Sequence, residues 1–264
     1  LSQNGQTIGS ALMKYKEYKQ LTNELKQLAD IPRIARERGL SIELLHVIYT
    51  QKVVRDTTKR YYRVKRKSSK MLYQWNKGKN FVQIAWENRF PASLIAMIIL
   101  QENKIPRKRA WKLLLNPEEI KDARLRREII KANKADGVYS PNGSKRQTER
   151  GRWGENKLRK WLNVKKIPHQ TEADLRGKYP KTPDFLLRKP LIWNGHKKFW
   201  IESKATFGDP VEIKKHLKKQ LTPYADLFGD GLVVYWFGYI DDLKLSIPDG
   251  VSVSDGSQFD GDMV

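Results

Sequence analysis

The chain has 264 residues, of which 52 are Lys or Arg and 29 are Asp or Glu, so its formal net charge is +23 at pH 7. It contains no cysteine, which excludes disulfides and thiol-ligated zinc or iron–sulfur sites and leaves oxygen atoms or one of four His residues to hold any metal. So large a positive charge draws a protein towards polyanions, and because no run of about 18 apolar residues and no lipidation motif is present, nucleic acid is favoured over a membrane.

The first half of the chain is predicted to be helical and contains a repeat. Segment 34–48 aligns without a gap to segment 84–98, an offset of 50 residues, and residues of the same identity or type coincide at Ile34/Ile84, Ala35/Ala85, Glu37/Glu87, Leu40/Phe90, Leu44/Leu94, Leu45/Ile95, Val47/Met97 and Ile48/Ile98. Each copy predicts a short helix, a tight turn, and a second helix with Ser41 or Ser93 as its N-cap. This pattern indicates two helix-turn-helix units, although plain helical hairpins would have the same pattern.

A basic stretch follows each copy of the repeat. We expect its side chains to contact the phosphates of duplex DNA, and the candidates are Lys52, Arg55, Lys59, Arg60, Arg63, Lys65, Arg66, Lys67, Arg107, Lys108 and Arg109. The alternative is a pair of solvated helix faces. Trp75, Trp86 and Trp111 are interpreted as helix-packing residues, with stacking on an unpaired base as the alternative for them.

A change of composition divides the chain. Residues 134–150 combine Gly, Ser, Pro, Asn and charge, which is typical of a linker, so we predict a helical DNA-binding region over 1–133 and a second domain over 151–264. The expected elements of the second domain are a helix over 151–164, a strand hairpin within 182–210, a polar helix over 210–229, a buried strand over 231–240 and an edge strand over 243–247 before a loose acidic tail. The predicted class is therefore α + α/β, and helix, strands, helix, strand is the minimal order expected of an αβββαβ second domain.

The hairpin carries charge where a core would be expected, namely Asp184, Glu202 and Lys204. Because side chains alternate along a strand, Glu202 and Lys204 share one face. Two carboxylates on one face repel each other unless something positive lies between them. Lys204 supplies part of that charge, and with oxygen ligands only, Mg²⁺ or Mn²⁺ could supply the rest. The alternative is a plain surface salt-bridge cluster.

The turn decides whether Asp184 joins that face. A two-residue loop at 194–195 would put Asp184 opposite Ala205, on the wrong face. A three-residue loop at 193–195, with Gly195 in the left-handed conformation, would put it opposite Lys204 and diagonal to Glu202, and this is the register that we predict. Because Pro190 cannot donate a hydrogen bond, the pairing should be interrupted near the turn.

At these residues a family resemblance becomes visible. "PDF" followed by "ESK" resembles the PD-(D/E)xK nuclease superfamily, and "KTPDF…WIESKATFGD…GDGLVVYWFGYI" looks like the codanin-interacting nuclease family, also called the TPD-motif family. The resemblance implies two helix-turn-helix units ahead of a restriction-endonuclease-like domain similar to archaeal Holliday-junction resolvases. By the same resemblance Asp184 and Glu202 would be metal ligands, with Ser203 and Glu155 as further ones. Lys204 would orient or activate water, and Gln220 would be a polar helper.

The function implied is a metal-dependent DNA endonuclease that hydrolyses phosphodiester bonds with Mg²⁺, or Mn²⁺ as a substitute, on branched or junction DNA, as in DNA repair. The alternative is a DNA-binding or architectural protein with a nuclease-like fold that does not cut, or cuts only with a partner. A homodimer is compatible with the resemblance, because junction resolvases usually act as dimers. We expect an intracellular, nucleoid-associated protein, or a nuclear one if the source is eukaryotic.

Two further expectations concern the source and the histidines. The high Lys content and missing Cys depart from the animal members of the family, which favours an archaeal source and argues against a codanin-type partner. His169, His196 and His216 have a spacing that fits no zinc motif, so we interpret them as surface residues.

Overall fold

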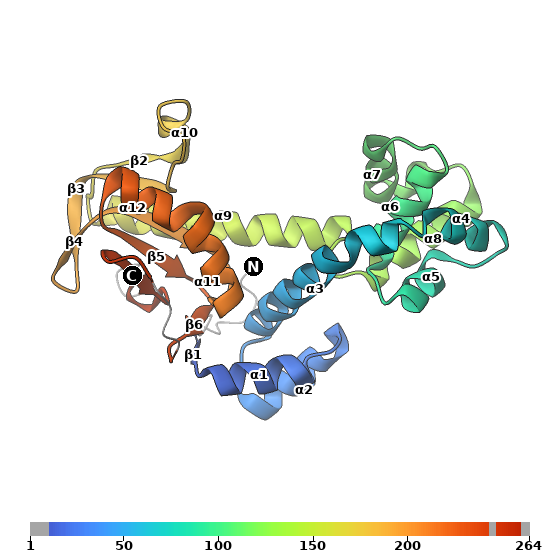
Figure 1. The fold of residues 1–264 in the computed structure, drawn as a ribbon, viewed down its shortest axis with the longest axis horizontal. Coiled ribbons are helices and arrows are strands. Elements are labelled where there is room, and N and C mark those ends of the chain that lie inside the picture. The colour runs from blue at the N-terminus through green and yellow to red at the C-terminus, as the bar shows by residue number, and fades with distance from the viewer. Residues whose placement is uncertain (1–10, 243–246, 260–264) are drawn as a thin grey trace. The chain divides into compact units, whose positions relative to one another are not determined.

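The computed structural model describes residues 11–242 and 247–259 and confirms an α+β chain (Figure 1). It divides into two compact units. We call residues 1–49 with 150–264 the sheet unit, and residues 50–149 the helical unit. Within the described ranges no helix is both long and apolar enough to cross a membrane.

The sheet unit takes its elements from both ends of the sequence. Its N-terminal part contains β1 (Ala11–Met13), α1 (Tyr15–Glu24), α2 (Ile31–Arg38) and the start of α3 (Ile42–Lys65). Its C-terminal part contains most of α9 (Pro141–Val164), then β2 (His169–Thr171), α10 (Glu172–Leu175), β3 (Phe185–Trp193), β4 (His196–Lys204), α11 (Pro210–His216), the π-helical turn η3 (Leu217–Leu221), α12 (Thr222–Phe228), β5 (Gly231–Tyr235), β6 (Gly238–Ile240) and β7 (Val251–Ser254).

Five of these strands form one mixed sheet in the order β2-β3-β4-β5-β7. The strands β2, β3 and β4 pair antiparallel, whereas β5 pairs parallel to both β4 and β7. A separate two-stranded sheet joins β1 to β6 in parallel. The candidate residues Glu202 and Lys204 therefore lie at the C-terminal end of a central strand.

Alternation along the central strands separates two apolar layers. Ile201, Leu232 and Val234 face the core that includes Leu158 of α9, whereas Trp200 and Val233 face the helices α11 and α12. Each face of the sheet is thus covered by helices, as a sheet with parallel central strands requires. Glu202 and Lys204 share the parity of Trp200 and so belong to the face covered by α11 and α12.

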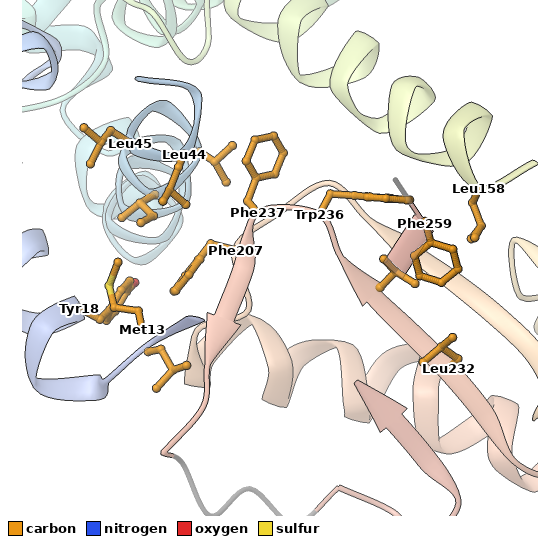
Figure 2. Packing of buried hydrophobic residues seen from close by; sticks show 14 of the residues in the cluster. Met13, Tyr18, Leu44, Leu45, Leu158, Phe207, Leu232, Trp236, Phe237 and Phe259 are labelled. Carbon is orange, nitrogen blue, oxygen red and sulfur yellow. The ribbon is translucent and has the colours of Figure 1, made fainter. Parts of the chain in front are cut away.

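The N-terminal helices share a core with the C-terminal strands (Figure 2). Met13, Tyr18 and Leu44 belong to the same buried cluster as Phe207 and Phe237. The Tyr18 hydroxyl also donates a hydrogen bond to Asp209 Oδ2 at 2.7 Å, in a buried position. The division predicted from composition, 1–133 against 151–264, therefore differs from the compact units, because residues 11–48 bury their apolar side chains against strands more than 150 residues later.

The segment expected to be a linker, 134–150, is mainly helical. Helix α8 (Ala123–Ala135) ends at its start, and α9 begins at Pro141 and continues without a break to Val164. Proline is tolerated in the first turn of a helix, where its missing N–H has no intrahelical partner. The Ser140 hydroxyl accepts a hydrogen bond from Gly143 N at 3.1 Å, so residues of turn-like composition here start a helix, and the change from the helical unit to the sheet unit falls within that helix, between residues 149 and 150.

The acidic tail expected after 247 also contains structure. Residues 251–254 form β7, an edge strand paired with β5. The strand predicted over 243–247 falls mostly on residues 243–246, which lie outside the described residues.

The helical unit contains the second half of α3, then α4 (Ser68–Asn76), α5 (Phe81–Asn88), α6 (Ala92–Glu102), α7 (Arg107–Leu115) and α8. The offset of 50 residues is kept in the structure. Helices α2 and α5 start at Ile31 and Phe81, and α3 and α6 start at Ile42 and Ala92. The left-handed residues that follow α2 and α5 are Gly39 and Arg89.

The two predicted N-caps have different outcomes. Leu44 N donates to Ser41 Oγ at 3.1 Å, so the cap on α3 is confirmed. The prediction for Ser93 is wrong, because α6 already begins at Ala92 and Ser93 N donates instead to the buried Asp136 Oδ2 at 3.1 Å. A carboxylate just after the end of α8 thus replaces the hydroxyl as the acceptor at this helix start.

Candidate active site at the end of strand β4

The turn and a bulge together bring Asp184 beside Glu202. The loop has two residues, Asn194 and Gly195, with φ of 49° and 80°, and it pairs Trp193 with His196. Positive φ at both positions is typical of a type I′ hairpin turn. Gly195 therefore has the predicted positive φ, but the predicted three-residue loop is wrong.

The bulge places Asp184 on the same face as Glu202, although the two-residue loop alone would place it on the opposite face. Between the pairs Leu191/Lys198 and Leu186/Trp200, β3 has four residues and β4 only one, so three extra residues shift the register and reverse its parity. Pro190 lies in this interruption, as predicted. Continuing the pairing past Phe185 puts Asp184 opposite Glu202, and not opposite Lys204 as expected.

Hydrogen bonds fix the two carboxylates in this position. Asp184 N donates to Glu202 Oε2 at 3.1 Å, and Ser203 N donates to Asp184 Oδ2 at 2.8 Å. Glu202 is buried, with 2 % of its surface exposed, whereas Asp184 is half-buried. The predicted pair of carboxylates on one face is thus present, at the boundary between the sheet and solvent.

Lys204 and Gln220 complete the polar group around Glu202. Lys204 Nζ donates to Glu202 Oε1 at 2.5 Å and to Gln220 Oε1 at 2.9 Å. Gln220 Nε2 donates to Glu202 Oε1 at 3.0 Å. Gln220 lies within the π-helical turn η3, a local widening that occurs frequently at functional sites.

Tyr224 is a site residue that the sequence reasoning missed. Its hydroxyl accepts a hydrogen bond from Gln220 Nε2 at 3.2 Å, and its ring packs edge-on against Trp200. Burial raises the pKa of Tyr224, so it is a neutral phenol at physiological pH. The spacing of four residues from Gln220 is the signal that could have identified it.

The electrostatics of the pair favour a cation. Burial, followed by the neighbouring Glu202 carboxylate, raises the pKa of Asp184 well above its ordinary value. Burial likewise raises the pKa of Glu202, although Lys204 opposes the shift. Each raised pKa means that ionising the carboxyl group costs free energy in the folded chain. A positive ion between the carboxylate oxygens would offset that free energy.

Glu155 and Ser203 are placed differently from the two central ligands. Glu155 lies next to Gly154, whose Cβ, if it had one, would be 2.9 Å from Ser203 Oγ, so α9 passes close to the end of β4. The Glu155 charge contributes to the raised pKa of Asp184, but no group of three or more acidic or His side chains that could hold a metal ion occurs among the described residues. Ser203 Oγ accepts from Trp236 Nε1 at 2.8 Å, which leaves its backbone as the part nearest Asp184.

The donor set nevertheless suits Mg²⁺, which is commonly held by one or two carboxylates and keeps several waters. Asp184 and Glu202 supply two carboxylates on one face, and the oxygens are those that a hard cation prefers.

The raised pKa values predict how stability depends on pH in metal-free protein. At pH values below the unfolded-state pKa of about 4, the carboxyl groups are protonated in both states and cost nothing. As pH rises from there to the higher folded-state pKa values, the unfolded chain loses its protons first and the folded chain loses stability; above the folded-state pKa values the loss is complete. Asp184→Asn should therefore raise the melting temperature at pH 7 to 8, by roughly 2–4 °C for each kcal/mol of repulsion relieved, and should converge with the parent near pH 4.

Thermal melts in EDTA across this pH range check the result. The matched control is Asp226→Asn, an exposed carboxylate of α12, which should leave the pH profile unchanged. A lower melting temperature for Asp184→Asn at neutral pH would mean that its carboxylate is a structural acceptor and not a repelled charge.

The histidines are placed in three different environments. His196 is exposed and His169 is half-buried, but the surface assignment of His216 is wrong. His216 Nδ1 lies 2.9 Å from the Tyr235 hydroxyl, and burial, with the charges of Lys204 and Lys215, lowers the pKa of His216 to about 3. His216 is therefore a neutral core residue. Its position among Lys residues in the sequence did not indicate that it is buried.

The predicted DNA-binding cations fall into two groups. Arg60 has structural partners within the helical unit, because it pairs with Asp56 and donates hydrogen bonds to the backbone oxygens of Asn88 and Arg89. Lys52 and Arg55 are half-buried on α3. The cations exposed to solvent are Lys59, Arg63, Lys65, Arg66, Lys67, Arg107, Lys108 and Arg109. We call these eight residues the basic surface.

The second helix of the second repeat is poorly exposed. Eight of the eleven residues of α6 are buried, among them Ile95, Ile98 and Ile99. A helix that enters a DNA groove must present one face to the bases. Trp86, interpreted from the sequence as a packing residue, is 81 % exposed, so that interpretation is wrong, whereas Trp75 and Trp111 do pack against the core of the helical unit.

Comparison with known proteins adds a family relationship. The family model described as "protein of unknown function TPD sequence-motif" matches residues 121–257, about half of the chain. The protein named CDAN1-interacting nuclease 1 of Mus musculus is 35% identical over 178 residues, which cover 64% of this chain and 63% of that protein. The proteins of the same name in Homo sapiens, 34% identical over 178 residues, and in Danio rerio, 37% identical over 145 residues, cover 64% and 54% of this chain.

The matched region spans 63% of the human relative and 48% of the Danio rerio relative. No solved structure matches the chain.

Proposed function

The chain belongs to the TPD-motif family, and on that premise we propose that it is a magnesium-dependent nuclease that hydrolyses phosphodiester bonds of DNA. The observation that carries the proposal is the convergence of Asp184, Glu202 and Lys204 at the end of β4, with both carboxyl pKa values raised. Relatives that carry the word nuclease in their names support the activity. Since the chain spans about 63% of the length of these relatives, their activity and their CDAN1 partner come to it as proposals.

The residues of the site have separate roles in this proposal. Asp184 and Glu202 would hold the ion, which when bound supplies positive charge against the phosphoryl oxygens and acidity to an attacking water. Lys204, whose ammonium is oriented by Gln220 Oε1, would contact a phosphoryl oxygen and stabilise the charge that develops on it. Gln220 and Tyr224 keep Glu202 and Lys204 in place and do not touch substrate.

The proposal extends to the fold and to the contact with DNA. We assign the sheet unit to the PD-(D/E)xK type, because one carboxylate directly precedes β3, the other lies with the lysine on the adjacent strand β4, and α9 and α11 pack on the two faces of the sheet. DNA would be held by the basic surface through its phosphates, and the buried state of α6 argues that the second repeat does not read bases. A homodimer, a nucleoid or nuclear location and an archaeal source remain part of the hypothesis.

A second candidate function has one observation in its favour. Lys204 already neutralises Glu202, and no third acidic ligand converges on the pair among residues 11–242 and 247–259. A protein in this state would bind DNA without cutting it until a partner or substrate rearranged the site.

A cleavage assay with the full chain separates the two functions. Labelled duplex, nicked, flapped, four-way-junction and single-stranded DNA, with an RNA duplex for comparison, are incubated in Mg²⁺, Mn²⁺, Ca²⁺ or EDTA. We expect cleavage in Mg²⁺ and Mn²⁺ and none in Ca²⁺, whose larger radius and looser geometry misplace the water. Tight DNA binding without cleavage of any substrate would support the non-cutting alternative and overturn the nuclease proposal.

A further inference from the structure

A groove of about 950 Å³ opens on the helical unit, and none of its lining residues belongs to the candidate active site. We call it the α6–α7 groove. It is lined by Thr57, Thr58, Tyr61, Tyr62, Leu94, Met97, Ile98, Gln101, Arg107, Lys108, Trp111, Tyr139 and Ser144. Its volume falls within the range of roughly 300–1,000 Å³ typical of small-ligand sites.

The walls of the groove combine aromatic and apolar surface. Tyr62 is 75 % exposed although its ring meets the ring of Tyr61 edge-on, at 5.5 Å between centroids. Trp111 forms part of the lining from α7, and Leu94 and Ile98 from α6. An exposed tyrosine beside this apolar lining suits a flat, weakly polar ligand that can stack on its ring.

The charge of the groove is entirely positive. Arg107 and Lys108 are exposed at the start of α7, and no Asp or Glu contributes to the lining. Two cations of α3 lie beside Tyr62, because Lys59 precedes it by three residues and Arg66 follows it by four, with Arg66 N donating to Tyr62 O at 3.1 Å. A ligand that suits both the aromatic lining and the positive charge of the groove is an aromatic ring attached to anionic groups.

We propose that the α6–α7 groove binds one unpaired nucleotide of a DNA strand. The base stacks on Tyr62, while Arg107, Lys108, Lys59 and Arg66 contact the phosphates on either side of it. A paired base is covered on both faces by its neighbours in the duplex, so it cannot offer a free face to Tyr62. The inference rests on the proposed function and deepens it, because it makes DNA with an unpaired nucleotide, as in gaps, flaps and junctions, the preferred substrate.

The test compares matched variants of the full chain on two DNAs. One DNA is a complete duplex and the other carries a single unpaired 2-aminopurine, a base whose fluorescence changes when it stacks. Tyr62→Ala should weaken binding of the second DNA about tenfold or more, abolish the fluorescence change, and leave duplex binding within about twofold. The control Tyr73→Ala removes another exposed tyrosine of the helical unit, which does not line the groove, and should change neither quantity.

A double charge variant tests the role of the positive side chains of the groove. Arg107→Gln with Lys108→Gln should weaken binding of the unpaired DNA more than Lys121→Gln with Arg127→Gln, which removes the same charge from exposed positions outside the groove. Equal effects of Tyr62→Ala and Tyr73→Ala, or equal weakening of both DNAs by Tyr62→Ala, would overturn the proposal. So would an acidic apolar peptide that occupies the groove while the 2-aminopurine signal stays unchanged, since this would assign the groove to a protein.

The failure of this inference can be told from failure of the proposed function. A parent protein that cuts no DNA but shows the Tyr62-dependent signal would lose the nuclease assignment and keep the nucleotide site. A parent protein that cuts DNA in Mg²⁺ without a Tyr62-dependent signal would keep the nuclease assignment and lose the nucleotide site.

Discussion

Asp184→Asn protein is expected to bind DNA at least as tightly as the parent while its cleavage rate in Mg²⁺ falls by roughly a hundredfold to a thousandfold or more. The substitution removes one ligand charge and keeps an oxygen able to accept the hydrogen bond from Ser203 N. The strand should therefore keep its shape, and a carboxylate that repels phosphate is gone. Single-turnover cleavage and fluorescence anisotropy on the same DNA measure the two effects separately.

Two companion variants sharpen this result. Lys204→Ala should also abolish cleavage but keep metal binding, because an ammonium is not a ligand. Asp226→Asn, an exposed carboxylate in the same unit, should cut at the parental rate. If Asp184→Asn cuts as fast as the parent in Mg²⁺, the carboxylate pair is not the catalytic site, whatever its electrostatics.

The affinity of the full chain for duplex DNA is expected to fall by about 10³–10⁵ between roughly 50 mM and 200 mM salt. The eight cations of the basic surface are exposed, and phosphate contacts by about six to ten such groups give a dependence of that size. Replacing Lys59, Arg63 and Arg66 together by Gln should reduce the slope of log affinity against log salt by about one for each phosphate that is no longer neutralised.

The matched control for this slope replaces three exposed cations outside the basic surface by Gln, namely Lys121, Lys131 and Lys134. This set should leave the slope close to that of the parent. Salt-independent binding, or an equal reduction for both sets of variants, would show that DNA is held somewhere other than the basic surface.

Local patterns predicted part of the geometry of the candidate site. The alternation of side chains put Glu202 and Lys204 on one face, and Asn-Gly at a turn implied a left-handed glycine. The register could not be obtained in the same way. Its parity depends on how many residues a bulge contains, and the sequence near Pro190 indicates that pairing stops there without indicating that three extra residues separate the strands.

Long-range packing limited the prediction of the fold. Composition suggested a linker at 134–150, and one boundary between the compact units does fall at 149–150, but it lies within helix α9. The repeat predicted helices in the first half of the chain, but periodicity within a helix does not identify the element against which it packs. For the same reason His216 could not be recognised as a core residue until α11 was seen against β5.

The sheet unit joins β1 to β6 across more than 220 residues, and this has a consequence for synthesis on the ribosome. Residues 50–149 form a continuous stretch, so they can fold as soon as they leave the exit tunnel. The segment 11–49 must then wait, with Leu44 and its apolar neighbours uncovered, until residues near 240 have been made. Such late closure of distant contacts slows folding and prolongs exposure to aggregation. A chaperone that shields α1 and α2 during translation would therefore affect the yield of the sheet unit although neither helix contributes to its candidate site.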